Sequence, residues 1–218
     1  MSRTRVKICG ITSREDALAA CEAGADAIGL ILYAPASQRQ IDANTARDIA
    51  MSLPPFVSAV GVTVDCPPNR VRQLLAHVPL SAVQMHGKES VQDVRSVQPT
   101  AAIKKLAATA ELRAEAEMWA KAIVPNLSGL LIDSAVGGGS GTESDWSLLE
   151  TFFASVDRSA LPPLVIAGGL RPGSIAGIIK RFSPWAVDVS SGVEEEPGRK
   201  SLTLMKEFVK AVRQAERR

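Results

Sequence analysis

The sequence predicts an α/β fold, a single (β/α)8 barrel (TIM barrel) that takes in residues 1–218 as one domain. Short apolar or β-branched runs alternate with amphipathic segments along the whole chain, and no linker, low-complexity segment or charge block divides the series. Strict strand–helix alternation implies parallel strands joined by right-handed crossovers. Eight such units in roughly 200–250 residues fit a closed barrel.

Eight runs are typical of parallel strands covered on both faces, because they are almost continuously apolar. In order they are Arg5–Cys9, Ala27–Leu32, Val57–Val62, Ala82–Met85, Ala101–Leu106, Gly129–Asp133, Leu164–Ala167 and Ala186–Val189. Helical periodicity follows each run, at Arg14–Ala23, Asp42–Met51, Pro68–Ala76, Glu89–Val97, Ala110–Ala122, Asp145–Ser155, Gly173–Arg181 and Ser201–Gln214. An open, doubly wound sheet is the alternative, but the turn after the first run, Cys9-Gly10-Ile11-Thr12, lacks its Gly-x-Gly-x-x-Gly signature.

Composition narrows the class of protein. The chain is 46% hydrophobic and 22% charged, which is ordinary for a soluble globular protein. Its net charge of +2, with no basic cluster among aromatic residues, argues against a nucleic-acid partner. Three unclustered cysteines argue against a disulfide framework and a structural zinc site. With no run long enough to cross a bilayer and no secretory signal, we expect a cytoplasmic protein without a membrane partner.

Polar side chains that interrupt the strand runs indicate where a site lies. They are Lys7 and Cys9 in the first run, Gln84 and His86 at the fourth, Asp133 at the end of the sixth and Asp188 in the eighth. Alternate residues of a barrel strand point inward, and catalytic groups lie at the C-terminal ends of the strands. These side chains are therefore predicted to meet at one mouth of the barrel, with Lys7 and Asp188 as a buried ion pair near Cys9.

Cys9 and Asp133 are the candidate catalytic residues. A thiol near a cation has an increased thiolate fraction and can act as a general base, although an arbitrary cysteine in an apolar run is more often a small buried hydrophobe. A carboxyl in partly apolar surroundings has a raised pKa and can act as a general acid, although Asp133 could instead hold a structural hydrogen bond. One group that takes a proton and one that gives it suffice for an isomerisation without a metal or redox cofactor.

Glycine-rich turns after the last two strands predict a phosphate site. Gly168 and Gly169 follow the seventh run, and Ser191 and Gly192 follow the eighth. Glycine lets backbone N–H groups approach an anion closely, and barrels commonly bind phosphate between these two loops. A Gly-Gly pair is also often only a tight turn, so the two neighbouring turns together carry the prediction. Arg39, in the loop after the second run, could clamp a carboxylate through its planar fork.

Six motifs spread from the first strand to the eighth carry a resemblance. They are Lys7-Ile8-Cys9-Gly10-Ile11-Thr12, Ser37-Gln38-Arg39, Gln84-Met85-His86-Gly87, Asp133-Ser134 with Gly138-Gly139-Ser140-Gly141, Ala167-Gly168-Gly169-Leu170, and Val187-Asp188-Val189-Ser190-Ser191-Gly192-Val193-Glu194 with Pro197-Gly198. Together they make the chain resemble the phosphoribosylanthranilate isomerases of tryptophan biosynthesis. A different phosphosugar barrel enzyme, such as an epimerase, and a non-catalytic barrel that binds a phosphorylated ligand are the alternatives.

The resemblance implies an Amadori rearrangement of N-(5-phosphoribosyl)anthranilate, a small phosphorylated substrate, without a cofactor. It casts Asp133 as the acid that opens the furanose ring and Cys9 as the base that removes the C2 proton. Arg39 would hold the anthranilate carboxylate, while His86 and Asp188 would line the site. The phosphate would lie at Gly168, Gly169, Ser191 and Gly192, with help from the loop that contains Gly139. Apolar helix faces serve the barrel and subunit contacts alike, so the sequence does not separate a monomer from a dimer.

Overall fold

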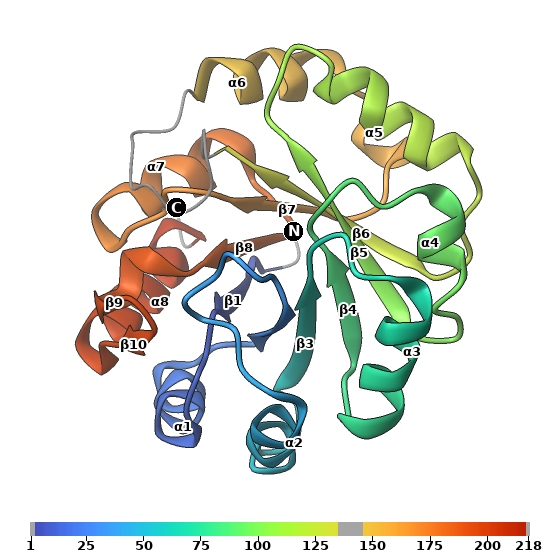
Figure 1. Ribbon diagram of the computed structural model, residues 1–218. Helices are drawn as coiled ribbons and strands as arrows, with labels where there is room; N and C mark the ends of the chain where they lie inside the picture. The colour runs from blue at the N-terminus through green and yellow to red at the C-terminus, as the bar shows by residue number, and fades with distance from the viewer. Residues whose placement is uncertain (1–2, 135–145, 217–218) are drawn as a thin grey trace.

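The computed structural model is a closed barrel of eight parallel strands in the order β1 to β8, ringed by helices (Figure 1). It describes residues 3–134 and 146–216. The strands are β1 Arg5–Cys9, β2 Ala27–Tyr33, β3 Ser58–Thr63, β4 Ala82–Met85, β5 Ala101–Ala107, β6 Leu127–Asp133, β7 Leu164–Ala167 and β8 Ala186–Val189. The predicted fold class is therefore confirmed.

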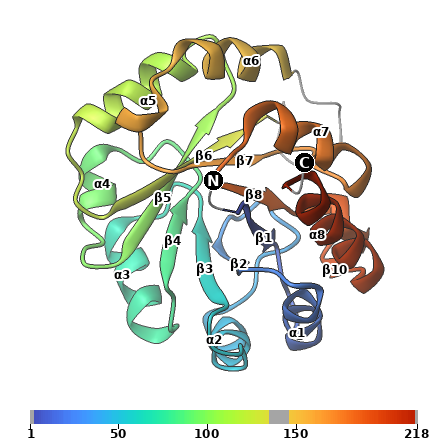
Figure 2. The same cartoon turned by 180° about the vertical axis from the view of Figure 1, so that it is seen from behind.

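Helices follow the strands and cover the outside of the barrel (Figures 1 and 2). They are α1 Arg14–Ala23, α2 Ala43–Met51, α3 Pro68–His77, α4 Val91–Arg95, α5 Leu112–Lys121, α6 Trp146–Ser155, α7 Pro172–Phe182 and α8 Leu202–Glu216, with short 3-10 turns η1 Arg158–Ala160 and η2 Ser191–Val193. Several begin at side-chain caps: Ser13 accepts a hydrogen bond from the Asp16 N–H, and Asp42 accepts from Asn44 and Thr45. None of the described helices is long and apolar enough to span a membrane.

The predicted helix Glu89–Val97 is too long at both ends. In the structure α4 covers only Val91–Arg95 and starts at Ser90, which forms a capping box with Asp93. Glu89 precedes the cap and pairs with Lys104 of β5. The predicted start of the sixth strand at Gly129 is also late, because pairing with β5 begins at Leu127.

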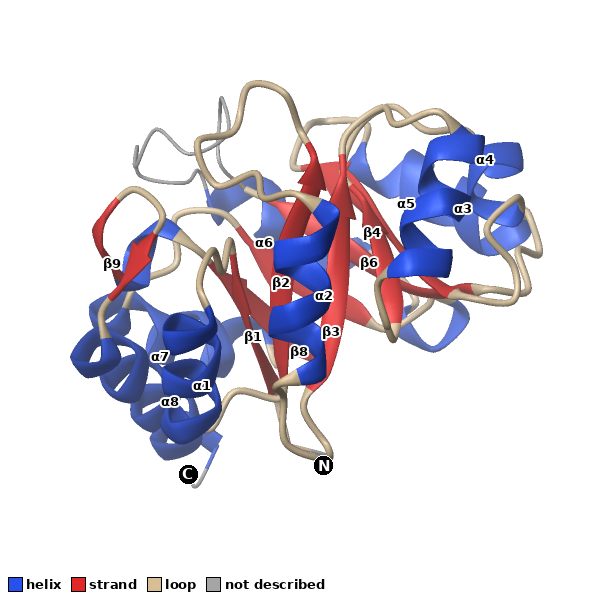
Figure 3. Cartoon of the chain, turned by 60° about the horizontal axis from the view of Figure 1, so that its bottom comes forward, coloured by secondary structure: helices blue, strands red, loops and turns tan. Residues whose placement is uncertain are grey.

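A small hairpin after β8 was not predicted. Its strands are β9 Glu194–Glu196 and β10 Arg199–Lys200, which pair antiparallel. Figure 3 shows β9 at the same end of the barrel as the loops that follow the strand arrowheads, while both termini lie at the opposite end. The hairpin is held to the loop after β1 and to α1, since Thr12 Oγ1 donates to the Gly198 carbonyl at 2.6 Å and the Lys200 N–H donates to Asp16 of α1.

Alternation along the strands separates two apolar cores. Residues such as Val6, Ile8, Leu130 and Ile132 face outward and pack with the helices in the larger core. A smaller cluster fills the inside of the barrel and consists of Leu131, Val165, Ala167 and Ala186, with Ile103 packed against it. Burial of these side chains removes apolar surface from water at about 25 cal/mol per Å². On β6 and β8 the next inward residues toward the C-terminal ends are Asp133 and Asp188.

Candidate active site

Strand register brings the polar side chains to one level of the barrel. Lys7 of β1 is in register with Asp188 of β8, Asp188 with Ala167 of β7, and Ala167 with Asp133 of β6. Because side chains alternate across a strand, residues in register share the inward face. Closure of the barrel therefore brings Lys7 and Asp188 side by side and places Asp133 at the same level, two strands away from Asp188.

A cavity of about 650 Å³ opens at this end of the barrel. It is lined by nine of the ten residues predicted for the site: Cys9, Arg39, His86, Asp133, Gly168, Gly169, Asp188, Ser191 and Gly192. The tenth, Gly139, lies outside the described residues, as does the rest of the glycine loop after β6. A volume of this size is typical of a small-molecule site.

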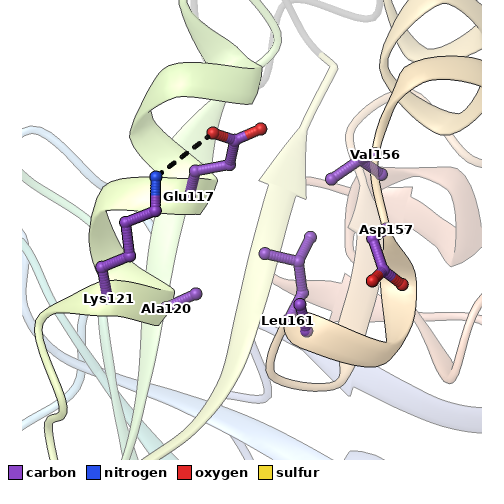
Figure 4. A pocket seen from close by; sticks show the side chains of 7 residues that line it. Glu117, Ala120, Lys121, Val156, Asp157 and Leu161 are labelled. Carbon is purple, nitrogen blue, oxygen red and sulfur yellow. Dashed lines mark ion pairs between the residues drawn. The ribbon is translucent and has the colours of Figure 1, made fainter.

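A second hollow, of about 240 Å³, lies on the outside of the barrel between the end of α5 and the segment after α6 (Figure 4). Glu117 and Lys121 of α5 form an ion pair of 3.6 Å on one side, and Val156, Asp157 and Leu161 form the other side. Its charged groups are at the surface, where an ion pair contributes little free energy. The larger cavity is therefore the candidate active site.

The predicted ion pair beneath Cys9 is confirmed. Lys7 Nζ donates to Asp188 Oδ2 at 2.7 Å, and the two side chains are 7% and 6% exposed. Burial acts to lower the pKa of Lys7, but the negative charges of Asp188 and of the Cys9 thiolate raise it by more, so its pKa lies above the ordinary value. The other carboxylate oxygen of Asp188, Oδ1, is buried without a hydrogen-bond partner in residues 3–134 and 146–216.

Cys9 lies in a buried, cation-bearing environment. Burial raises the pKa of its thiol, and although the Lys7 ammonium acts to lower it, the net direction is upward. The sequence predicted that a nearby cation would increase the thiolate fraction; the cation is present, but desolvation outweighs it. Gly29 of β2 is next to the thiol, and a side chain there would collide with Cys9 Sγ and approach Lys7 Nζ. Gly29 thus leaves room for both groups.

The Asp133 carboxyl group is in contact with the His86 imidazole. His86 Nε2 and Asp133 Oδ2 are 3.2 Å apart, and His86 Nδ1 is 3.0 Å from Gln84 Nε2. With the amide in this orientation, Nδ1 accepts from Gln84 and Nε2–H donates to Asp133. Gln84 and His86 share the inward face of β4, as predicted, and the sequence had assigned His86 only to the lining of the site.

His86 is held in place by a second buried ion pair. Lys104 Nζ of β5 donates to Glu89 Oε2 at 2.7 Å and to the Gly87 carbonyl at 2.5 Å. Glu89 in turn accepts from the N–H groups of Gly87 and Asp65. Both side chains of the pair are about 5% exposed or less. The turn directly after His86 is therefore fixed by several charge-assisted hydrogen bonds. Sequence reasoning missed this pair, although Lys104 interrupts an apolar strand run.

Arg39 forms a two-point pair that was not predicted. Its Nε and Nη2 atoms donate to the two carboxylate oxygens of Glu194 at 2.8 and 2.7 Å. Glu194 also accepts from Lys200 Nζ at 2.6 Å. The hydrogen bond from Arg39 and the one from Lys200 hold the pKa of Glu194 below its ordinary value, against the effect of burial. Glu194 stood in a quoted motif, but its partner lies more than 150 positions earlier in the chain.

The glycine turns after β7 and β8 are in direct contact. Gly168 and Gly169 have positive φ values of 88° and 63°, a conformation that glycine adopts without strain. A Cβ at Gly192 would overlap the carbonyl oxygen of Leu170, so only glycine permits this approach of the two loops. Ser134 Oγ donates to the carbonyls of Ala167 and Gly168 and ties the end of β6 to the same turn. In the described residues, no cluster of three or more His, Cys, Asp or Glu side chains forms a candidate metal site.

This arrangement defines a class of protein: a (β/α)8-barrel enzyme whose mouth combines a buried thiol and a carboxyl group with backbone turns suited to a phosphate. The family model described as N-(5'-phosphoribosyl)anthranilate (PRA) isomerase matches residues 6–211. The chain belongs to this family, and the resemblance seen in its motifs is confirmed.

Individual relatives agree with the family match. The N-(5'-phosphoribosyl)anthranilate isomerase of Pseudomonas aeruginosa strain LESB58 is 40% identical over 220 residues, which covers 100% of this chain and 99% of that protein. The crystal structure of the isomerase from Thermotoga maritima is 38% identical, with a TM-score of 0.86 over 97% of this chain and 99% of that one. A phosphoribosylanthranilate isomerase in complex with reduced 1-(o-carboxyphenylamino)-1-deoxyribulose 5-phosphate is 37% identical, with a TM-score of 0.82 and the same coverage of both chains.

Proposed function

We propose that this isomerase converts N-(5-phosphoribosyl)anthranilate to 1-(2-carboxyphenylamino)-1-deoxyribulose 5-phosphate with Asp133 as general acid and Cys9 as general base. The observation that carries the assignment is their common position. Both line one cavity from strands three positions apart in the closed sheet, and each has its own polar partner, Lys7 for Cys9 and His86 for Asp133. An acid and a base on different sides of a substrate can act on two different atoms of it, as an aldose–ketose rearrangement requires.

Asp133 protonates the furanose ring oxygen in the first step. The C1–O bond breaks, its electron pair goes to the ring oxygen, and the anthranilate nitrogen forms a protonated Schiff base with C1. The contact with His86 supports this role, because the imidazole can exchange hydrogen-bond direction with the carboxyl group. When Asp133 is protonated, its O–H can donate to His86 Nε2, and Gln84 can turn its amide oxygen toward Nδ1–H. Gln84 Oε1 has no other partner among the described residues.

Cys9 removes the C2 proton in the second step. The C–H electron pair forms the C1–C2 double bond and neutralises the Schiff base nitrogen, which gives an enolamine that tautomerises to the ketone. The proton goes to Sγ, so the thiolate is the reactive form. Burial raises the pKa of the free thiol, while Lys7 acts in the opposite direction. The cationic Schiff base adds a second positive charge near Sγ and favours the thiolate when it is needed.

The remaining contacts orient the substrate. Arg39 binds the anthranilate carboxylate through the part of its fork that Glu194 does not occupy, notably Nη1. The backbone at Gly168, Gly169, Ser191 and Gly192 binds the phosphate, with Gly139 as an additional contact. Asp188 Oδ1 accepts a hydrogen bond from a sugar hydroxyl, which satisfies its unpaired buried oxygen. The proposed location of the enzyme is the cytoplasm, the compartment expected from the sequence.

Loss of substrate fluorescence tests the activity, with purified protein added to freshly made phosphoribosylanthranilate. We expect turnover, and we expect Cys9→Ser and Asp133→Asn each to lower kcat by about 100-fold or more. Cys21→Ser and Asp157→Asn are matched controls, since both residues lie outside the cavity, and should retain activity. No turnover by the wild type would reject the isomerase and favour the epimerase or the binding protein. Near-normal rates in Cys9→Ser or Asp133→Asn would reject the role of that residue.

A further inference from the structure

Lys200 is a buried lysine that the reaction described above does not use. It lies on β10, its side chain is 0% exposed, and it does not line the cavity. Its ammonium donates to Glu194 Oε1 at 2.6 Å and to the Ser190 carbonyl at 3.2 Å. A buried ammonium is costly unless it has such acceptors. The hairpin that carries Lys200 is hydrogen-bonded to the loop after β1 and to α1, and these contacts fix the position of the lysine.

Lys200 changes the charge of the site that surrounds Arg39. Glu194 carries one negative charge and contacts two cations, Arg39 on one side and Lys200 on the other. Without Lys200, Arg39 and Glu194 would form a neutral pair, because the carboxylate would cancel the guanidinium. Such a pair attracts a further carboxylate weakly. With Lys200 the cluster keeps one positive charge in excess, and Arg39 is the member that reaches the cavity.

We infer that Lys200 is a positioning and specificity residue that supplies the excess positive charge with which Arg39 selects a carboxylate-bearing substrate. Glu194 fixes the orientation of the arginine through two hydrogen bonds, and Lys200 removes the electrostatic cost of doing so. The inference rests on the proposed role of Arg39. The inference goes beyond that role in one respect. Lys200, which does not contact the substrate, determines how strongly Arg39 prefers a substrate that carries a carboxylate.

The experiment compares two ligands that differ only in the carboxylate. One is reduced 1-(o-carboxyphenylamino)-1-deoxyribulose 5-phosphate, and the other is the same compound with a plain phenyl ring. Calorimetric titration gives a Kd for each, and their ratio measures carboxylate preference. We expect Lys200→Met to lower this ratio about tenfold, the effect of losing one nearby charge at a high effective dielectric. Binding of the phenyl compound should stay within about twofold, since no charge of its own faces Arg39.

A double variant separates charge from general damage. Glu194→Gln/Lys200→Met removes one negative and one positive charge, so Arg39 alone again provides the excess. We expect its ratio to return to within about threefold of the wild type. It also removes both members of a buried pair, which is better tolerated than removing one, so it remains informative if Lys200→Met does not fold. Lys206→Met is the matched control because Lys206 pairs with Glu22 on the surface, and its ratio should not change.

Arg39→Met distinguishes the inference from the proposed function. If this variant keeps the wild-type ratio, Arg39 does not hold the carboxylate, and both the proposed role and the inference fail. If Arg39→Met loses the preference while Lys200→Met keeps it, the inference alone fails. Equal weakening of both ligands by Lys200→Met, or a double variant no better than Lys200→Met, would likewise overturn it. Loss in Lys200→Met with recovery in the double variant supports it.

Discussion

Lys7→Met tests the electrostatics beneath the proposed base. Lys7 and Asp188 are paired at 2.7 Å with side chains at most 7% exposed. Asp188 Oδ1 already has no partner among the described residues, so Oδ2 depends on the ammonium. The substitution keeps most of the unbranched lysine stem but leaves a buried carboxylate without a counter-charge. This is the situation in which the desolvation cost of an ion appears in full.

The expected loss is about 3–5 kcal/mol in the free energy of unfolding, the usual cost of breaking a buried pair from one side. Lys7→Met/Asp188→Leu removes both charges and should recover most of that loss, because an apolar pair of similar volume avoids desolvation. Lys206→Met breaks an exposed pair with Glu22 and should cost less than about 1 kcal/mol. Urea unfolding followed by tryptophan fluorescence measures all three variants against the wild type.

The pH dependence of this difference follows from the pKa of Lys7. Burial acts to lower that pKa, but Asp188 and Cys9 raise it by more, so the folded-state value exceeds the ordinary 10.5. The stabilisation is therefore complete below the pKa of an unfolded lysine and is lost only as the pH rises through the higher folded value. Between about pH 6 and 9 the gap between wild type and Lys7→Met should stay constant. A gap below about 1 kcal/mol, or a double variant no more stable than Lys7→Met, would refute the reasoning.

Three further predictions concern the loops and the thiol. Gly192→Ala should raise KM about tenfold or more, because its Cβ would push apart the proposed phosphate loops. The control Gly177→Ala meets open space in α7, so it should leave the kinetics unchanged and add about 0.5–1 kcal/mol of stability. An unchanged KM in Gly192→Ala would contradict the proposed phosphate site. Glu89→Gln should cost about 3–5 kcal/mol in urea unfolding by leaving Lys104 buried without its counter-charge, and a loss under about 1 kcal/mol would show that the pair is dispensable. Since burial raises the pKa of Cys9 despite Lys7, the residual kcat/KM of Asp133→Asn, which has lost the titrating acid, should rise with pH above neutrality, and a decline from about pH 7 to 9 in that variant would reject the thiolate as base.

The barrel was predictable because its strands carry the strongest local signal. The runs Arg5–Cys9, Ala82–Met85, Leu164–Ala167 and Ala186–Val189 have the same bounds in the structure as in the sequence analysis. Parallel strands buried on both faces must be continuously apolar, so a polar or glycine residue ends them visibly. Helix α4 was predicted too long because Glu89 has good helical propensity, and its actual contact with Lys104 depends on the neighbouring strand.

The hairpin β9–β10 could not be predicted from local sequence. Its strands contain only charged residues, Glu194–Glu196 and Arg199–Lys200, and glutamate and lysine are depleted in strands. The hairpin is stable because Thr12 and the α1 segment, almost 190 positions away, hold it in place. These contacts form only when β1 and β8 lie side by side in the folded barrel. For the same reason, the pairing of Arg39 with Glu194 on the hairpin could not be predicted from local sequence.

The members of the site were predictable, whereas their pairing was not. Period-two alternation assigned Lys7, Cys9, Asp133 and Asp188 to the inside of the barrel. Lys7 and Asp188 could also be paired, since the first and last strands of a closed barrel are neighbours. Asp133 and His86 lie on strands that are not adjacent, and only the diameter and tilt of the barrel determine that their side chains meet.

In the proposed arrangement, the two anionic ends of the substrate are recognised by different physical means. Phosphate carries up to two charges and three acceptor oxygens, and it requires several N–H groups, which the close turns at Gly168 and Gly192 can supply because neither has a side chain in the way. The carboxylate requires a planar fork, and Glu194 leaves Arg39 only part of its fork to offer. A phosphate at Arg39 would leave acceptor oxygens without donors, because Glu194 occupies Nε and Nη2, and a carboxylate at the turns would leave N–H groups unsatisfied. Each half of the site therefore disfavours the anionic group that belongs in the other half. The substrate can then bind in one orientation only, with its C1–C2 bond between Asp133 and Cys9.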